Sequence, residues 1–211
     1  MTDMLQQKIW AGYRKSAERL GVPCQLYRPQ SPGPVRAGEN ELESLPIFVQ
    51  PYGSSDRPQG YGENAWKLFA DGAKLAVGDY LAADGRIWFV AALQPLLPLL
   101  AILCPRIISG WRAGRPADPL FPGYGGAEGG VDPLFSGWPA SILQGGKGDR
   151  SEAGLPEDIR APWWAICLPA IPTVILRTGD RLSDDLGRMY LISSAELSDL
   201  GWRLLAQQIV M

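Results

Sequence analysis

Histidine is absent from the 211-residue chain, and cysteine is scarce. Without histidine there is no Ser-His-Asp or Cys-His nucleophile pair and no histidine-ligated metal site. The three cysteines, Cys24, Cys104 and Cys167, form no CxxC pair, and an odd number does not make a disulfide framework. We therefore expect reduced, buried thiols, as in a cytosolic product, and we assign no catalytic, cofactor-binding or metal-binding residue.

Neither sign of charge dominates, because 20 Lys and Arg stand against 22 Asp and Glu, for a net charge of -2. This balance gives no electrostatic attraction to nucleic acid or to an anionic membrane. The longest apolar run, residues 87–103, is interrupted by Gln94, Pro95 and Pro98 and is shorter than the roughly 20 residues of a spanning helix. It predicts a buried strand, a turn and a second strand. We expect neither nucleic acid nor a membrane as a partner.

Glycine and proline are abundant, with 25 and 19 residues, and there are eight tryptophans. This composition argues against a helical bundle and against simple disorder. Glycine and proline concentrate in residues 28–64 and 110–162, but the second stretch keeps large apolar side chains that a flexible linker would not carry. These are Leu120, Phe121, Tyr124, Leu134, Phe135, Trp138, Ile142 and Leu143. We predict long, ordered arms whose aromatic residues pack within the subunit or on another chain.

An N-terminal helix is expected, because apolar residues recur at intervals of three or four before a glycine and a proline that end it. The apolar stripe contains Leu5, Ile9, Tyr13, Ala17 and Leu20. It fits a helix that packs on its own core or one that docks on a neighbouring subunit. The segments in order are a helix at 1–27, an extended arm at 28–64, a first β module at 65–110, an excursion at 111–161 and a second β module at 162–211. The tail from residue 202 fits a strand or a helix.

An internal repeat links residues 78–90 with residues 179–192. Both contain the pattern G-D-x-L…G-R-x-[WY]-x-[VI], with one residue inserted in the second turn. Each copy predicts a strand, a tight turn in which glycine supplies positive φ, and a returning strand. We therefore predict a mainly β fold with two similar barrel-like or sandwich-like modules.

The aspartates of the repeat allow two interpretations. A cluster of carboxylates would suggest a metal site or acid chemistry, whereas turn-forming aspartates would be exposed at hairpin ends, and their Asp-Gly surroundings favour turns. The residues are Asp79, Asp84, Asp180, Asp184 and Asp185. We expect Arg86 and Arg188 to pair with these aspartates or to be solvated at the rim.

Other candidate sites are weak. The glycine-rich runs 123–126 and 145–148 lack the strand-to-helix context of a phosphate-binding loop. Trp163 and Trp164 fit a sugar-binding or base-stacking platform, but their apolar run after a proline favours a core or subunit contact. A pair of carboxylates for glycoside hydrolysis needs only spatial proximity, and nothing in the sequence points to one. We therefore predict that the chain is not an enzyme.

Four blocks of sequence together resemble a family of virion structural proteins of tailed bacteriophages with contractile tails and related prophages. The first block is the N-terminal helix with Leu20-Gly21 and Tyr27-Arg28-Pro29. The second block joins residues 78–81 with Gln94–Pro98. The third block joins residues 137–141 with residues 145, 155–156 and 162–164. The fourth and most specific block is GD at 179–180, DDLGR at 184–188 and AELSDLGWRL at 195–204.

This resemblance implies a non-enzymatic virion component, assembled in the bacterial cytoplasm, that forms rings with itself and contacts tail-tube, sheath, baseplate or neck subunits. One location is the baseplate end of the tail tube, as for the ripcord proteins that link tube, sheath and baseplate. The other is the neck, as for head–tail connector proteins. A soluble β-barrel module that binds a ligand through Trp138, Trp163 and Trp164 is the alternative from another class.

Overall fold

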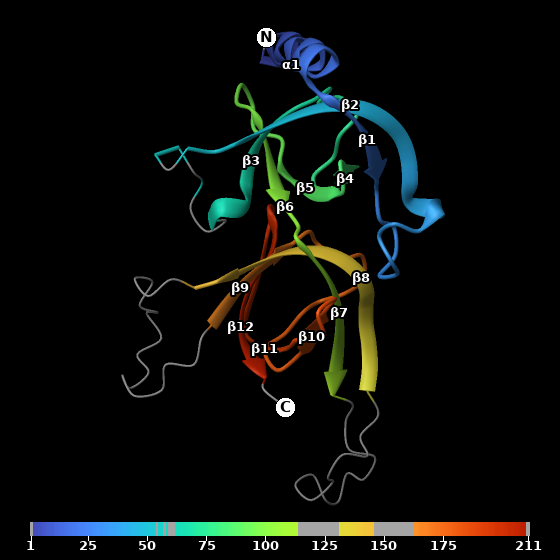
Figure 1. Cartoon of the computed structure of the whole chain (residues 1–211), viewed down its shortest axis with the longest axis vertical. Helices are drawn as coiled ribbons and strands as arrows, with labels where there is room; N and C mark the ends of the chain where they lie inside the picture. The colour runs from blue at the N-terminus through green and yellow to red at the C-terminus, as the bar shows by residue number, and fades with distance from the viewer. Residues whose placement is uncertain are drawn as a thin grey trace, which may run out of the picture.

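The computed structural model describes residues 2–53, 55–56, 58, 62–113, 131–145 and 163–209. The described residues form an N-terminal helix, α1 (Thr2–Leu20), and two closed antiparallel barrels stacked below it (Figure 1). Barrel 1 contains β1 (Val22–Tyr27), β2 (Glu41–Pro51), β3 (Ala65–Phe69), β4 (Tyr80–Ala83), β5 (Arg86–Ala92) and β6 (Leu99–Leu103). Barrel 2 contains β7 (Arg106–Ala113), β8 (Val131–Gln144), β9 (Trp163–Leu168), β10 (Arg181–Asp184), β11 (Met189–Ser198) and β12 (Gly201–Ile209). The prediction of a mainly β protein with an N-terminal helix and two barrel modules is confirmed.

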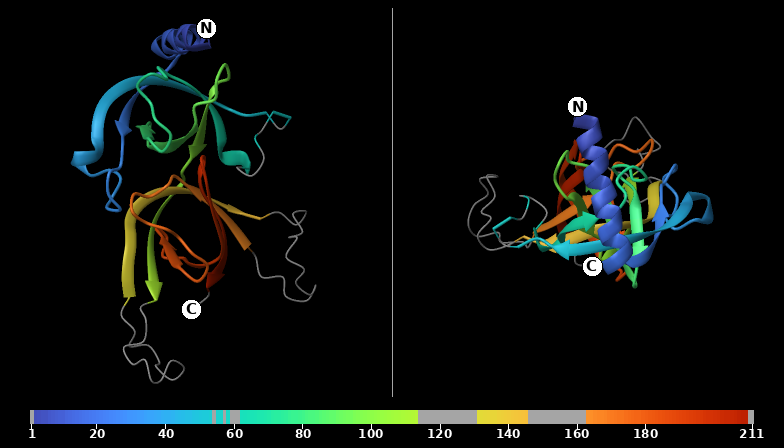
Figure 2. Two further views of the ribbon diagram at one scale, coloured as in Figure 1. Left: turned by 180° about the vertical axis from the view of Figure 1, so that it is seen from behind. Right: turned by 90° about the horizontal axis from the view of Figure 1, so that it is seen from above.

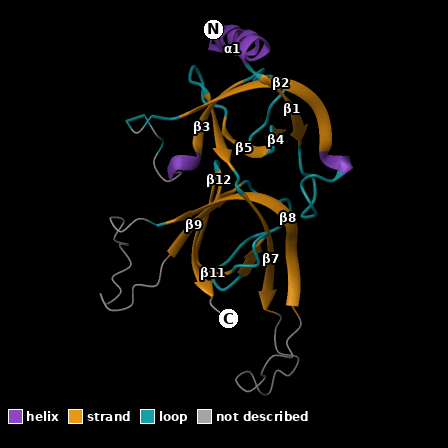
Figure 3. Cartoon of the chain, viewed as in Figure 1, coloured by secondary structure: helices purple, strands orange, loops and turns teal. Residues whose placement is uncertain are grey.

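The two barrels have the same strand order, β1-β2-β3-β6-β5-β4 in barrel 1 and β7-β8-β9-β12-β11-β10 in barrel 2. Figure 3 shows both as bodies of strands joined by loops. Each barrel also carries an irregularity at the same point of the same strand pair, between Val90 and Ala92 in β5 and between Ile192 and Ser194 in β11. The repeat therefore covers whole six-stranded barrels, not only the hairpin that the sequence pattern shows.

Helix α1 packs on β2 and β3 of barrel 1. Ile9, Tyr13 and Ala17 of the predicted stripe are half-buried or buried, but Leu5 and Leu20 are at least half exposed. The helix ends at Leu20, and a side chain on the next residue, Gly21, would meet backbone oxygens of β2 and of the helix itself. Among the residues described here, no helix is both long and apolar enough to cross a membrane.

Two β segments that the sequence left as arm or excursion belong to the barrels. The predicted arm at 28–64 contains β2, with η1 (Gly38–Asn40) before it and η2 (Gly62–Asn64) after it. The predicted excursion at 111–161 contains the end of β7 and all of β8, so these boundaries were wrong. The remaining parts of that excursion, 114–130 and 146–162, lie outside the described residues and contain Leu120, Phe121, Tyr124 and the run 123–126.

Proline within strands explains why β2 and β8 were assigned to an arm and an excursion. Proline has no N–H for the ladder and usually argues against a strand. In barrel 1, however, Pro23 of β1 lies opposite Pro46 of β2. Antiparallel ladders alternate between hydrogen-bonded and non-hydrogen-bonded pairs, so two facing prolines at a non-hydrogen-bonded pair remove no ladder bond.

Other local predictions agree with the structure. The run 87–103 forms most of β5, a turn and β6. The tail is a strand, β12, in which Trp202, Leu204 and Ala206 are buried in alternation with more exposed residues. This two-residue period places them on the inner side of barrel 2.

The apolar core has two parts. One fills barrel 1 and includes Leu26, Leu68, Trp88 and Val90. The other runs from the outer face of barrel 1, at residues such as Tyr80, into barrel 2. The barrels are therefore joined by a shared apolar cluster, and they lie one above the other along the long axis of the molecule (Figure 2).

Two glycines are expected to respond oppositely to alanine substitution. Gly201 has φ 99°, and a Cβ there would lie 2.5 Å from the Leu168 carbonyl oxygen, whereas Gly12 is on the exposed side of α1 with nothing within 4 Å. Gly201→Ala should lower the free energy of unfolding by about 1–3 kcal/mol because of backbone strain. Gly12→Ala should raise it by about 0.5–1 kcal/mol because alanine favours helix. Urea unfolding measures both, and equal effects would contradict this structure.

Candidate functional site: duplicated arginine–aspartate clamps and the contact between the barrels

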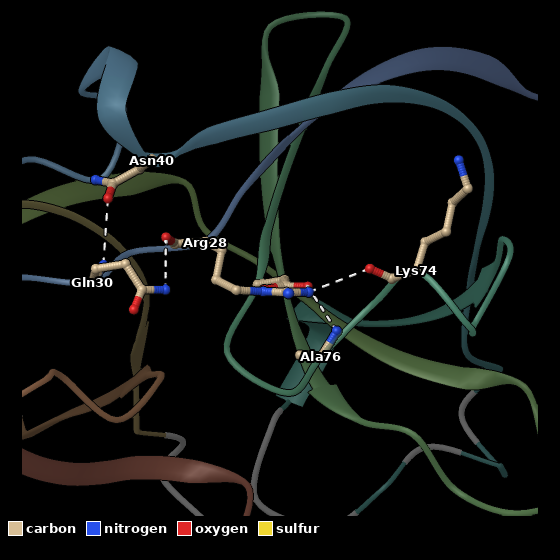
Figure 4. Close-up of polar contacts among 6 residues, drawn as sticks. Arg28, Gln30, Asn40, Lys74 and Ala76 are labelled. Atoms are coloured by element: carbon tan, nitrogen blue, oxygen red, sulfur yellow. Dashed lines mark hydrogen bonds and ion pairs between the residues drawn. The ribbon is translucent and has the colours of Figure 1, made fainter.

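Asp79 is the most buried charged residue of barrel 1, with 1% of its surface exposed. Its carboxylate accepts two hydrogen bonds from Arg28, from Nε and Nη2, each 2.7 Å long. It also accepts the backbone N–H of Ala76 at 2.7 Å, and Arg28 donates in addition to the Lys74 carbonyl (Figure 4). We call this arrangement the Arg28–Asp79 clamp. It ties the end of β1 to the loop between β3 and β4.

The local backbone places Asp79 at this position. Gly78 adopts φ 92°, a conformation that favours glycine, and its N–H donates to the Val90 carbonyl. The Val90 N–H in turn donates to the Asp79 carbonyl at 2.8 Å. The Gly-Asp pair is therefore bonded to β5 through the main chain while its carboxylate turns inward to Arg28.

Barrel 2 contains the same arrangement at equivalent positions. Asp180, also 1% exposed, accepts Nε of Arg112 at 2.7 Å and Nη2 at 2.8 Å. It accepts the Arg177 N–H at 2.7 Å, and Arg112 donates to the Ile175 carbonyl at 2.9 Å. Gly179 has φ 92°, as does its counterpart in barrel 1. We call this the Arg112–Asp180 clamp, and it is a second, independent occurrence of the same geometry.

Each clamp neutralises a carboxylate that burial would otherwise penalise. Parallel bidentate hydrogen bonds between guanidinium and carboxylate are among the stronger polar contacts in proteins. Hydrogen bonding to Asp79 raises the pKa of Arg28, and hydrogen bonding to Asp180 raises that of Arg112, in both cases against an opposing effect of burial. Both arginines are partly exposed, so the clamps lie at the barrel surface with their carboxylates facing inward.

Arg86 and Arg188, expected to pair with the aspartates or to be solvated at the rim, are not the side chains that hold Asp79 and Asp180. Arg86 is exposed, and the Arg188 guanidinium lies 5.8 Å from the centre of the Trp164 ring. The acids are instead held by Arg28 and Arg112, which sequence reasoning missed. A usable signal existed, because each of these arginines follows an aromatic residue at or near the end of the first strand of its barrel.

The turn interpretation is correct for only some of the aspartates. Asp84 and Asp185 are exposed at hairpin turns. Asp184 is buried and accepts the Tyr190 hydroxyl and the N–H groups of Leu186 and Arg188. Within the described ranges, no three histidine, cysteine, aspartate or glutamate residues gather as metal ligands. The five aspartates are therefore divided between loop-holding and turn positions and form no single site.

The contact between the barrels is polar as well as apolar. The buried Tyr80 hydroxyl on the outer face of barrel 1 donates to the Pro139 carbonyl of β8 at 2.7 Å. The ring of Tyr80 meets that of Trp138 edge-on, with centroids 6.0 Å apart. Asn64 donates to the Ser141 hydroxyl at 2.8 Å in a buried bond. These directed bonds fix how barrel 1 sits on β8.

The loop between β1 and β2 also crosses to barrel 2. The Trp138 indole N–H donates to the Gly33 carbonyl at 2.9 Å, and the Ser136 N–H donates to the Pro32 carbonyl at 3.0 Å. Trp138, predicted as an anchor of an ordered arm, is thus an anchor between the two barrels of one chain.

Trp164 packs inside barrel 2 rather than forming a binding platform. Its ring meets that of Tyr190 edge-on at 5.9 Å, as Trp66 meets Trp88 at 6.2 Å in barrel 1. By strand register, Trp164 and Tyr190 occupy in barrel 2 the positions of Trp66 and Trp88 in barrel 1. The interpretation of Trp164 as a core residue is therefore supported, while Trp163 is half-buried on the outer face.

All three cysteines are buried thiols, as predicted. Burial raises the pKa of Cys24 to about 12 and that of Cys167 to about 11. Burial also raises the pKa of Cys104 and of Tyr80 well above their ordinary values. These groups are protonated at neutral pH, and the three thiols pack among apolar side chains.

Removal of either clamp carboxylate should destabilise the chain by a similar amount. Asp79→Asn or Asp180→Asn leaves the shape intact but places an amide against a guanidinium, at an expected cost of about 2–3 kcal/mol in the free energy of unfolding. Asp84→Asn is the control, since Asp84 is exposed at φ 48°, a conformation that Asn tolerates, and a change below about 0.5 kcal/mol is expected. Chemical denaturation of the three variants measures this, and clamp variants as stable as the control would refute it.

Stability should fall in alkali. The buried thiols and Tyr80 hold their protons more tightly in the folded chain than in the unfolded chain, so unfolding releases protons at high pH. Their contribution is complete below pH 9.0, the ordinary thiol value, and is lost as the pH rises through about 11 and about 12 for Cys167 and Cys24. Unfolding midpoints in urea at several alkaline pH values measure this, and a midpoint that is flat or rising there would contradict the burial of these groups.

Comparison with protein-family models, with curated proteins and with solved structures gives no match.

Proposed function

We propose that the chain is a non-enzymatic structural protein of a contractile-tailed phage particle, in which it joins tail-tube, sheath and baseplate subunits. The proposal starts from the sequence blocks that resemble such virion proteins. It is supported by how the chain uses its polar groups, because the buried carboxylates Asp79, Asp180 and Asp184 hold loops and turns. They are structural residues in a rigid two-barrel unit.

The observation that carries the proposal is the loop between β5 and β6. Leu96 has φ 62°, a conformation that costs about 1–3 kcal/mol for a bulky residue. Its N–H donates to the Gln6 side chain of α1 at 2.9 Å, which fixes the loop against the helix. Leu96 and Leu97 are nevertheless 46% and 53% exposed. A strained backbone is thus held in a shape that presents two leucines to solvent.

This loop lies within one of the resembling blocks, Gln94–Pro98, and next to exposed apolar residues of α1. Met4 and Leu5 lie within one turn of Gln6 and are both exposed. We call Met4, Leu5, Leu96 and Leu97 the helix-end patch. Exposed apolar side chains on a helix and a loop that a hydrogen bond joins suit a contact with another protein. The helix-end patch therefore fits a subunit that a neighbouring virion protein covers.

Electron microscopy with gold-labelled antibody against this chain tests the proposal on particles from the producing strain. Label at the tail tip supports the baseplate location. Label beneath the head would replace it with the neck, where the chain would act as a head–tail connector. Particles without label, and without the chain in their denatured protein profile, would refute a virion role.

A pair of variants tests the helix-end patch in the same particles. Leu96→Ser with Leu97→Ser should reduce incorporation of the chain at least about tenfold, because the polar side chains remove the apolar contact. Leu186→Ser is the control, since Leu186 is 52% exposed on a turn of barrel 2, away from this patch. Equal incorporation of both variants would show that the patch is not the contact.

A further inference from the structure

One row of residues crosses the outer face of each barrel. In barrel 1, strand register aligns Ala65, Ile102, Phe89, Tyr80 and Tyr27 across five neighbouring strands. We call this the barrel-1 row. All five residues are at most 7% exposed, and all belong to the cluster that barrel 1 shares with barrel 2. The barrel-1 row is therefore the face by which barrel 1 binds barrel 2.

The same row exists on barrel 2. Register aligns Trp163, Gln207, Leu191, Arg181 and Trp111 in the equivalent strands. We call this the barrel-2 row. Leu191 is 37% exposed, Arg181 and Gln207 are exposed, and the two tryptophans are half-buried. Nothing in the described part of the chain covers this row as barrel 2 covers its counterpart.

The composition of the barrel-2 row suits an interface that forms after folding. Tryptophan and arginine are the residues most enriched at the energetic centres of protein interfaces. Leu205, the equivalent of the buried Leu100, is also exposed and extends the apolar part of this face. Arg181 stands at the position of Tyr80, whose hydroxyl donates to the Pro139 carbonyl.

The surface of barrel 2 that contacts the barrel-1 row also has an equivalent in barrel 1. Barrel 1 sits on β8 at Trp138–Ser141, and register makes Leu45–Phe48 of β2 the equivalent segment in barrel 1. Proline occupies the same position in both segments, Pro139 and Pro46. Both halves of the contact between the barrels are therefore repeated, and they lie on different barrels.

On barrel 1, helix α1 covers only part of this equivalent surface. Tyr13 of α1 packs edge-on against Phe69 at 5.2 Å, close to the segment. Beside the end of α1 lies a cleft of about 320 Å³. Its lining is mostly apolar, with Leu20, Ile47, Phe48, Val49 and Trp88, and it also includes the charged residues Asp84 and Arg86. We call it the helix–barrel cleft.

We infer that the barrel-2 row of one copy of this chain binds the helix–barrel cleft of a second copy, repeating between molecules the contact that joins the barrels within one. The inference rests on the proposed function and names the surfaces for the ring that the resemblance to virion proteins implies. Because the two surfaces differ, the contact is head-to-tail, and it closes a ring or extends as a filament. The guanidinium of Arg181 can donate to the Pro46 carbonyl of the second copy, as Tyr80 donates to Pro139.

Self-association of the purified full-length chain tests this. Light scattering after size-exclusion chromatography should show a mass that rises with protein concentration above the 23.0 kDa of one chain. Leu191→Glu places a charge in the barrel-2 row, and Leu20→Arg places a charge in the helix–barrel cleft. Each substitution should weaken association at least about tenfold. Leu197→Glu on the same strand and Leu5→Arg on the same helix are the matched controls, since both residues are similarly exposed. Circular dichroism confirms folding, and Leu205→Glu is a second variant of the same face.

Mixing the two impaired variants distinguishes a head-to-tail contact from a symmetric one. Each variant keeps the surface that the other lacks, so an equimolar mixture should form a dimer of twice the chain mass that grows no further. A wild-type chain that stays monomeric up to millimolar concentration overturns the inference, as does a mixture that stays monomeric. These measurements use no phage particle, so absence of the chain from virions would overturn the proposed function and leave this result standing.

Discussion

A buried carboxylate that must be neutralised is the constraint around which each barrel is organised. Asp79 and Asp180 are withdrawn from water, and an unpaired charge there would cost several kcal/mol. Arg28 and Arg112 supply the charge from the end of the first strand, so the first strand, the Gly-Asp turn and the returning strand are all fixed by one polar contact.

The same constraint explains how much of the fold the sequence could predict. The Gly-Asp and Gly-Arg pattern indicates turns, because positive φ and an inward carboxylate are requirements of the local backbone. The pattern led correctly to two similar modules. The arginines could not be found in this way, because Arg28 and Arg112 lie 51 and 68 residues from their aspartates. Only closure of the barrel brings each pair together, and the distance along the chain differs because the intervening strands and loops differ in length.

Proline and aromatic residues misled sequence reasoning for a related reason. Prolines in β2 and β8 suggested irregular arms, but both segments are strands, and in barrel 1 Pro46 faces a second proline, Pro23. Trp138 and Phe135 were correctly taken as anchors, yet sequence alone could not tell whether an anchor packs within one subunit or on another. The structure decides this for Trp138, whose ring packs on Tyr80 of barrel 1 and whose N–H bonds to Gly33.

In the head-to-tail assembly that we infer, the two outer rows let one architecture serve a permanent and an exchangeable contact. The barrel-1 row is covered as soon as the chain folds, so it can be wholly apolar apart from the tyrosine hydroxyls. The barrel-2 row must remain in water until a partner arrives, and a wholly apolar face of that kind would aggregate. Arg181 in place of Tyr80 and Gln207 in place of Ile102 keep it hydrated, while Leu191, Trp111 and Trp163 retain apolar surface for docking. The differences between the repeats are thus what a head-to-tail assembly of preformed subunits requires.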